Sequence, residues 1–211
     1  MSVSFADKSN GWICGDKGLI LRTKDGGRSW QLQNSPTDKD LLAIFFIDTL
    51  HGVSAGDWGA VVYTSNGGET WKNITLPEDI VFYDVLMIEP ARIIVAGEFG
   101  IIFESRDAGV TWKSLISEQK AIDSPQTIFA LDYDQDVIYA VGMDGSIQFS
   151  KDFGGTWVKA LNETKASLYN IEMKGQSGWA VGDLGTVLRT ENTGNTWTKI
   201  ELPPTYKLSW I

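Results

Sequence analysis

The hydrophobic positions of the chain form short apolar or alternating runs, among them residues 60–63, 101–103 and 186–188, each bounded by Gly, Asn or Asp. Runs of this length with such boundaries are typical of β-strands joined by tight turns. No stretch shows the period of an amphipathic helix. The pattern therefore predicts an all-β protein.

Two signatures repeat five times along the chain. The first is a Gly-x-x-Gly turn, at residues 15–18, 56–59, 97–100, 142–145 and 182–185. The second is an Asp-box, Ser/Thr-x-Asp/Asn-x-Gly-x-Ser/Thr-Trp, which ends at Trp30, Trp71, Trp112, Trp157 and Trp197. A period of about 40 residues lies in the range that marks propellers and solenoids.

Each repeat is expected to hold four strands, A to D. Strand A is the apolar run, as at 44–46, 128–130 and 168–171, and strand B precedes the Gly-x-x-Gly turn. Strand C follows the turn, and strand D begins at the Asp-box tryptophan. Five such repeats predict a β-propeller of five four-stranded antiparallel blades, each with an Asp-box hairpin.

We expect one domain over residues 1–211, with blades at about 1–34, 35–75, 76–116, 117–161 and 162–200. The first strand A is short, and the tail at 201–211 resembles its missing start. Such a tail could act as a closing strand and remove open sheet edges. The alternative is a fragment of a longer array.

The Asp-boxes are interpreted as structural. The Asp or Asn at the third position can accept backbone N–H groups of the following turn, Gly supplies an unusual backbone angle, and Trp supplies an apolar body. The residues concerned are Asp25, Asn66, Asp107, Asp152 and Asn192, together with the five tryptophans. Metal binding would require these side chains to converge, which one box per blade does not favour.

Charge narrows the choice of partner. With 27 acidic and 18 basic residues, the net charge of -9 argues against a nucleic-acid groove and favours a basic segment of another protein or a cationic ligand. The single cysteine, Cys14, excludes an intrachain disulfide framework. No apolar run is long enough for a membrane span, and the N-terminus lacks a signal-peptide pattern. We expect a monomer without metal or cofactor, in a compartment that these features leave open.

The segments 178–197 and 11–30 share a Gly-Trp, a Gly-x-x-Gly turn and an Asp-box. This combination resembles the Asp-box (bacterial neuraminidase) repeat family and, more closely, the photosystem II stability and assembly factor-like family. The resemblance implies a non-enzymatic scaffold for photosynthesis that docks onto a membrane-protein precursor, in a periplasmic, lumenal or extracellular setting. The chain departs from it in having five repeats and few arginines: Arg22, Arg28, Arg92, Arg106 and Arg189.

A carbohydrate-binding or sialidase-like glycoside hydrolase propeller is the alternative function, and a truncated piece without activity is a third. Sialidases need three convergent arginines with a Tyr nucleophile, a Glu base and an Asp acid. Arg22 and Arg189 occupy equivalent positions just before their boxes, which indicates a surface role in strand pairing. The chain is therefore not expected to be an enzyme.

Three further features are interpreted as structural. His51 lies in an A–B loop, and Cys14 occupies a strand B position where the other blades carry Ala or Val. The run Asp132, Asp134 and Asp136 resembles the start of an EF-hand loop but lacks its Gly and its final Glu, so a solvated acidic loop is expected.

Strand direction places the Gly-x-x-Gly turns and the D–A connections on one face of each blade, and the Asp-boxes on the other. We expect a partner-binding surface made of an acidic ring with apolar tips: Asp16, Asp57, Trp58, Glu98, Phe99, Met143, Asp144, Asp183 and Leu184. The alternative is that the tips fold over neighbouring blades as local core. The D–A connections vary in length, with 33–40 and 117–125 long and 75–79 short, as recognition loops often do.

Overall fold

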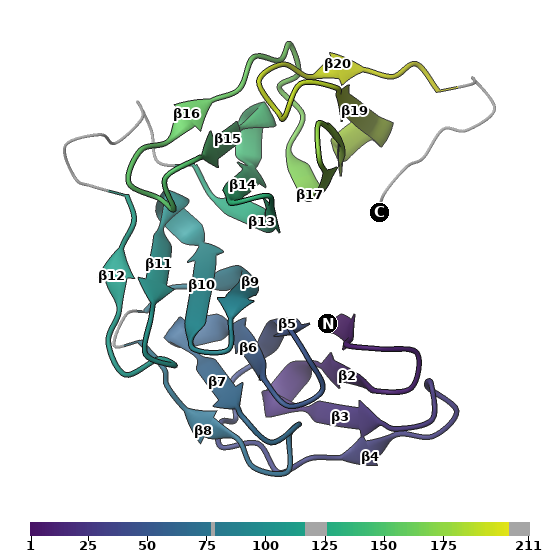
Figure 1. Ribbon diagram of the computed structural model, residues 1–211, viewed down its shortest axis with the longest axis vertical. Coiled ribbons are helices and arrows are strands. Elements are labelled where there is room, and N and C mark those ends of the chain that lie inside the picture. The colour runs from purple at the N-terminus through teal and green to yellow at the C-terminus, as the bar shows by residue number, and fades with distance from the viewer. Residues whose placement is uncertain (77–78, 117–125, 203–211) are drawn as a thin grey trace. The chain divides into compact units, whose positions relative to one another are not determined.

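A computed structural model describes residues 1–76, 79–116 and 126–202. These residues form five four-stranded antiparallel sheets, called blades one to five in chain order (Figure 1). The chain clusters into two compact units. Unit 1 comprises residues 1–98 with 102–114 and holds blades one to three, and unit 2 comprises residues 99–101 with 115–211 and holds blades four and five. The predicted closing strand and the connection at 117–125 lie largely outside the described residues.

In every blade the strands follow one another from A to D across the sheet. Blade one holds β1 (Ser2–Phe5), β2 (Gly11–Cys14), β3 (Ile20–Thr23) and β4 (Gln31–Leu32), and blade two holds β5 (Leu41–Phe46), β6 (Gly52–Gly56), β7 (Val61–Thr64) and β8 (Lys72–Asn73). Blade three holds β9 (Phe82–Glu89), β10 (Arg92–Gly97), β11 (Ile102–Ser105) and β12 (Lys113–Ser114). Blade four holds β13 (Ile128–Asp134), β14 (Val137–Gly142), β15 (Ile147–Ser150) and β16 (Val158–Lys159). Blade five holds β17 (Leu168–Lys174), β18 (Ser177–Gly182), β19 (Thr186–Thr190) and β20 (Thr198–Lys199).

The predicted strand order is confirmed, with differences at the strand ends. Strand D begins one residue after the Asp-box tryptophan and is only two residues long. At Trp197 the backbone N–H donates to the Leu161 carbonyl of the preceding connection, so it does not join the sheet. Strand A is longer than its expected apolar run in blades two, four and five. β5 begins earlier, at Leu41, whereas β13 and β17 continue to Asp134 and Lys174. Near the start of each of these strands the pairing with strand B shifts register.

In unit 1 the A strands β1, β5 and β9 contact one another in succession. Between blades one and two the rings of Trp12 and Phe46 stack with centroids 3.6 Å apart, and Trp71 meets Phe46 edge to face. Cys14 is buried in the same core, and its Sγ lies 3.3 Å from the Leu41 carbonyl oxygen. Burial raises the pKa of this thiol, so Cys14 is a small core residue and a poor nucleophile.

In unit 2 the strands β13 and β17 lie side by side, and two carboxylates of β13 link them. Asp132 Oδ2 accepts the Met173 N–H, and Asp134 Oδ2 accepts the Gly175 N–H at 2.6 Å. The prediction of a solvated acidic loop was therefore wrong for these two residues, since β13 extends to Asp134. Burial raises the pKa of Asp132.

Candidate partner-binding site

Each Gly-x-x-Gly segment forms a single 3-10 turn between strands B and C. The second of its two middle residues is left-handed in every copy, with φ between 53° and 57°: Lys17, Trp58, Phe99, Asp144 and Leu184. The second glycine follows with φ near +70°, a conformation that residues with a Cβ rarely adopt. This backbone directs the left-handed residue outwards as the tip of the turn.

The first glycine of the turn is required by space. At Gly56 the backbone is extended, with φ of -177°, which any residue can adopt. A Cβ there would lie 2.0 Å from the Asp40 carbonyl oxygen at the start of the same blade's strand A. That carbonyl accepts the Asp57 N–H at 2.9 Å, which ties the turn to strand A. Gly97 and Gly142 meet a carbonyl oxygen in the same way.

The apolar tips are exposed. The exposed fractions are 60% for Trp58, 62% for Phe99 and 93% for Leu184, so these side chains are not local core. In blade four the acidic and apolar residues exchange places. Asp144 takes the left-handed position, while Met143, which is 41% exposed, takes the position that Asp57 holds in blade two.

Trp58 borders a pocket of about 570 Å³ in unit 1. Its other walls are residues 35–39 of the connection from blade one, with Asn73 and Thr75 at the end of β8. The Lys39 Nζ lies 5.9 Å from the centroid of the indole ring and 3.7 Å from Asp38. The pocket thus lies between a turn tip and a long D–A connection. Hydroxyl and amide groups surround its one aromatic ring.

Three carboxylates lie beside this pocket in unit 1. Burial first, and then the charges of Asp40 and Glu98, raise the pKa of Asp57. Asp40 accepts the Lys17 N–H at 2.7 Å, and Glu98 accepts the Val81 N–H at 3.0 Å. Within the described part of the chain, no Lys, Arg or His forms an ion pair with any of the three. Their negative charge is therefore left without a cation.

The acidic turn residues of unit 2 have local hydrogen-bond partners. Asp183 accepts the Tyr169 hydroxyl at 3.0 Å, and Asp144 accepts an amide N–H of Gln126 at 2.8 Å. Asp16, in unit 1, is exposed. The carboxylates at the predicted acidic positions thus differ from blade to blade in their hydrogen-bond partners and in their exposure.

Sequence reasoning missed Asp40, Tyr83 and the side chains at 35–39. The length of the connection at 33–40 suggested a role in recognition, but it did not predict that this connection would lie against Trp58. Tyr83 carried no signal of its own. Burial and the charges of Glu98 and Asp57 raise the pKa of its hydroxyl, so it belongs to the same neighbourhood.

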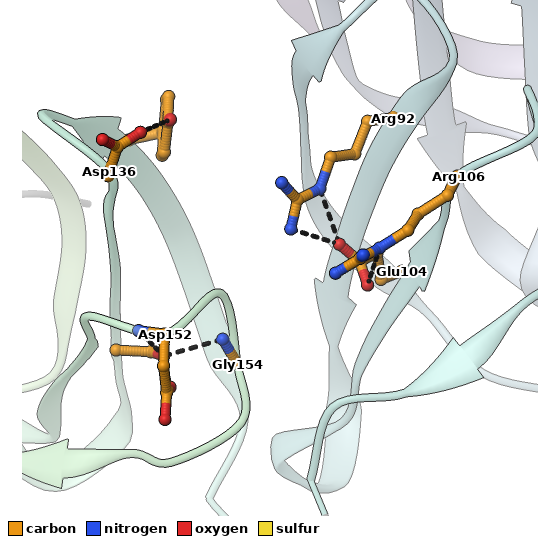
Figure 2. Close-up of polar contacts among 8 residues, drawn as sticks. Arg92, Glu104, Arg106, Asp136, Asp152 and Gly154 are labelled. Atoms are coloured by element: carbon orange, nitrogen blue, oxygen red, sulfur yellow. Dashed lines mark hydrogen bonds and ion pairs between the residues drawn. The ribbon is translucent and has the colours of Figure 1, made fainter.

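The polar side chains of the Asp-boxes form hydrogen bonds within their own turns. In blade four Asp152 Oδ1 accepts the Ser150 hydroxyl at 2.8 Å and the Thr156 N–H at 2.7 Å. The Gly154 N–H donates to Ser150 Oγ (Figure 2). Asn66 and Asn192 accept the equivalent hydroxyl and N–H through their amide oxygens. These polar groups are occupied by their own turns, which is a structural use. Of the closing tryptophans, Trp71 and Trp197 are buried, whereas Trp30, Trp112 and Trp157 are only partly buried.

The arginines form contacts within their own blades. Arg92 and Arg106 both bind Glu104, at 2.6 Å and 2.9 Å (Figure 2). Arg22 and Arg189 lie over Trp12 and Trp179, the residues opposite them on strand B, at 5.3 Å and 5.4 Å. A cation over an indole face on paired strands adds cross-strand stabilisation.

The remaining candidates from the sequence are His51, a metal site and a membrane span. His51 Nδ1 lies 2.9 Å from Asp48 in the same loop. Among the residues that the structure describes, no three His, Cys, Asp or Glu side chains gather where they could hold a metal ion. The described helices include none with the length and apolarity needed to cross a membrane.

Comparison with solved structures identifies the fold. A structure of YCF48 bound to a D1 peptide is 17% identical over 94% of this chain and 81% of that chain, with a TM-score of 0.65. YCF48 from Cyanidioschyzon merolae is 16% identical over 100% of this chain and 86% of that chain, with a TM-score of 0.62. A GH74 xyloglucanase from Xanthomonas campestris is 12% identical over 95% of this chain but only 38% of that chain, with a TM-score of 0.72.

These likenesses establish the β-propeller fold of five four-stranded blades, and at such identities they establish the fold alone. The comparison with curated proteins gives no significant match. The model of one family, described as photosynthesis system II assembly factor YCF48, matches residues 28–170 and 134–208. Since these matches span most of the sequence, the chain belongs to the YCF48 family of photosystem II assembly factors.

Proposed function

We propose that this chain is a non-enzymatic assembly factor that captures a segment of a membrane-protein precursor on the faces bearing the Gly-x-x-Gly turns. The observation that carries the proposal is Trp58, an aromatic side chain held exposed by a left-handed turn at the edge of a pocket. Family membership supports an assembly role, and the YCF48 structure with a D1 peptide supports a peptide as the ligand.

The physical logic is that of a preformed anchor site. The left-handed backbone and the close-packed glycine hold Trp58 in position before any partner arrives, so little ordering is needed on binding. Exposed aromatics next to a pocket are the residues that contribute most to protein interfaces. The remaining predicted positions, Asp16, Met143, Asp144, Asp183 and Leu184, would supply the rim of the surface on their own blades.

The test replaces the two aromatic tips. A fluorescently labelled D1 peptide is titrated with the chain and with the double variant Trp58→Ala/Phe99→Ala, while thermal unfolding is followed in parallel. We expect the double variant to lose binding at least tenfold with an unchanged melting temperature, because exposed side chains contribute within about 0.5 kcal/mol to stability.

Val110→Ala is the matched control, since Val110 is exposed and belongs to the Asp-box of blade three. It should bind the peptide as the parent chain does. A melting temperature that falls while binding persists would contradict the proposal and make the tips structural.

We also propose that the chain does not hydrolyse polysaccharide. Its likeness to the GH74 xyloglucanase is one of fold, and it spans 38% of that chain. Two of its five arginines are bound to Glu104, and Arg22 and Arg189 lie over the rings of Trp12 and Trp179. Incubation with xyloglucan should release no reducing ends, and their release would favour the hydrolase function.

Family membership also supports a proposal for the compartment. We propose that the protein acts in a lumenal, periplasmic or extracellular space, and favour the first two because it would meet there the exposed segments of a membrane-protein precursor. Fractionation of cells producing a tagged chain should recover it with lumenal or periplasmic markers. Recovery with cytosolic markers would contradict this placement.

A further inference from the structure

The surroundings of Trp58 specify the kind of segment that fits there, if the proposed docking function holds. Asp57 precedes Trp58 in the turn, and Asp40 follows Lys39 in the connection that forms the pocket wall. Asp57 is half-buried, and its N–H donates to the Asp40 carbonyl at 2.9 Å. The other end of the turn is tied to the segment before β9, since the Gly59 N–H donates to the Ile80 carbonyl at 2.7 Å. The next residue of that segment, Val81, donates its N–H to Glu98, whose charge also acts on Asp57. One aromatic surface thus lies beside three like charges.

The three carboxylates differ in the hydrogen-bond donors that the chain provides for them. Asp40 and Glu98 each accept one backbone N–H, from Lys17 and Val81. For the Asp57 carboxylate, the described residues provide neither a hydrogen-bond donor nor an ion-pair partner. A cation placed at Asp57 would therefore relieve repulsion among three carboxylates and replace water at a half-buried one.

Lys39 does not fill this role. Its Nζ lies over the Trp58 ring and 3.7 Å from Asp38, a residue that is almost fully exposed. Since the ring is 60% exposed, an apolar side chain could cover it by displacing one flexible lysine. The remaining pocket walls offer the hydroxyls of Ser35, Thr37 and Thr75 for a peptide backbone.

We infer that the occupant of this site is an extended segment of another protein in which a Lys or Arg adjoins an apolar residue. The apolar side chain packs on Trp58 in the pocket, and the cation lies against Asp57 with Asp40 and Glu98 behind it. Charge complementarity selects this occupant, since the chain as a whole carries a net charge of -9.

The test uses three capped hexapeptides that differ at one position, Gly-Ser-Phe-X-Ser-Gly with X as Arg, Gln or Glu. Binding is followed by the NMR signal of the Trp58 indole N–H, assigned by its loss in Trp58→Phe. We expect the Arg peptide to bind about tenfold more tightly than the Gln peptide, and the Glu peptide to bind most weakly. The Arg preference should shrink in 0.5 M NaCl, because salt screens exposed charges over roughly 10 Å at 0.1 M and 3 Å at 1 M.

Asp57→Asn should remove most of the preference for Arg over Gln. Glu69→Gln is the matched control, because it removes the same charge from the Asp-box of blade two, where Glu69 is exposed. The control should keep the full preference for Arg.

The outcomes separate the two proposals. Equal binding of the three peptides, or a preference for Glu, would overturn the charge selection and leave peptide docking at Trp58 in place. Failure of every peptide, the D1 peptide included, to perturb Trp58 would remove the docking function and this inference together. Self-association that is lost in Trp58→Ala would show that the occupant is a second copy of the chain, and would also overturn the inference.

Discussion

At the scale of single residues, the two glycines of the repeated Gly-x-x-Gly turn are required for different reasons. The second glycine of each Gly-x-x-Gly turn is needed for its left-handed backbone, whereas the first is needed because a carbonyl oxygen approaches it. Blade one departs from this rule. A Cβ on Gly15 would meet only side-chain atoms, the nearest being Met1 Cγ at 3.5 Å.

Glycine-to-alanine substitution at this position should therefore cost much more stability in blade two than in blade one. Gly56→Ala forces a Cβ to 2.0 Å from the Asp40 carbonyl, so we expect a loss of about 2–3 kcal/mol in the free energy of unfolding. Gly15→Ala should change it by less than about 0.5 kcal/mol. Urea denaturation of the two variants measures the difference. Equal losses would contradict the assigned role of the carbonyl contact at Gly56.

At the scale of elements, blade three carries a buried charge cluster where other blades use aromatic or basic residues. Glu104 on β11 is 3% exposed, and Arg92 on β10, which binds it, is 11% exposed. Arg106, at the start of the Asp-box, completes the cluster but is 65% exposed. Burial decides the energetics here, since a buried charge that loses its partner has no water to replace it.

We expect Glu104→Ala to destabilise the chain by about 3–5 kcal/mol, because the largely buried Arg92 guanidinium loses its ion pair with Glu104. Arg106→Ala should cost no more than about 1 kcal/mol, as for exposed ion pairs. Both values come from chemical denaturation at one pH and salt concentration. A comparable loss for the two variants would show that the cluster acts as one exposed network.

At the scale of the whole molecule, the five Asp-boxes divide into two chemical classes. Hydrogen bonds from Ser29, first its hydroxyl and then its N–H, lower the pKa of Asp25 from 3.8 to about 2, and Thr111 does the same for Asp107. Hydrogen bonds from Thr156 also lower the pKa of Asp152. The boxes of Asn66 and Asn192 keep the turn without a titratable group.

Acid should therefore weaken the molecule through three of its five boxes. A carboxyl with a lowered pKa in the folded state stabilises the fold above its unfolded pKa of 3.8, and this contribution disappears as the pH falls towards about 2. Replacing Asp25, Asp107 and Asp152 by Asn should flatten the dependence of the urea midpoint on pH between about 4 and 2. Parallel curves for parent and variant would place the acid sensitivity elsewhere.

Much of this structure was predictable because it is encoded within one repeat. The strand order and the Asp-box turns follow from alternating hydrophobicity and turn chemistry, which act over a few neighbouring residues. The exposure of tips such as Trp58 was decided by the structure, since the sequence also allowed them to fold over neighbouring blades. The family assignment followed from the same motifs. The assignment of partner binding to the turn tips stays a prediction, because the motifs that identify the family are those that build its blades.

What the sequence alone could not decide is which residues from different blades meet. The approach of residues 35–39 to Trp58, the grouping of Asp40 and Glu98 around Asp57, and the use of Asp132 to hold β17 all join residues distant along the chain. Such contacts depend on how one sheet packs on the next, and no local period records that packing. The repeat thus determined the fold of each blade and the position of its turn tips. The tertiary structure decided which charged residues and which connecting segments lie around those tips.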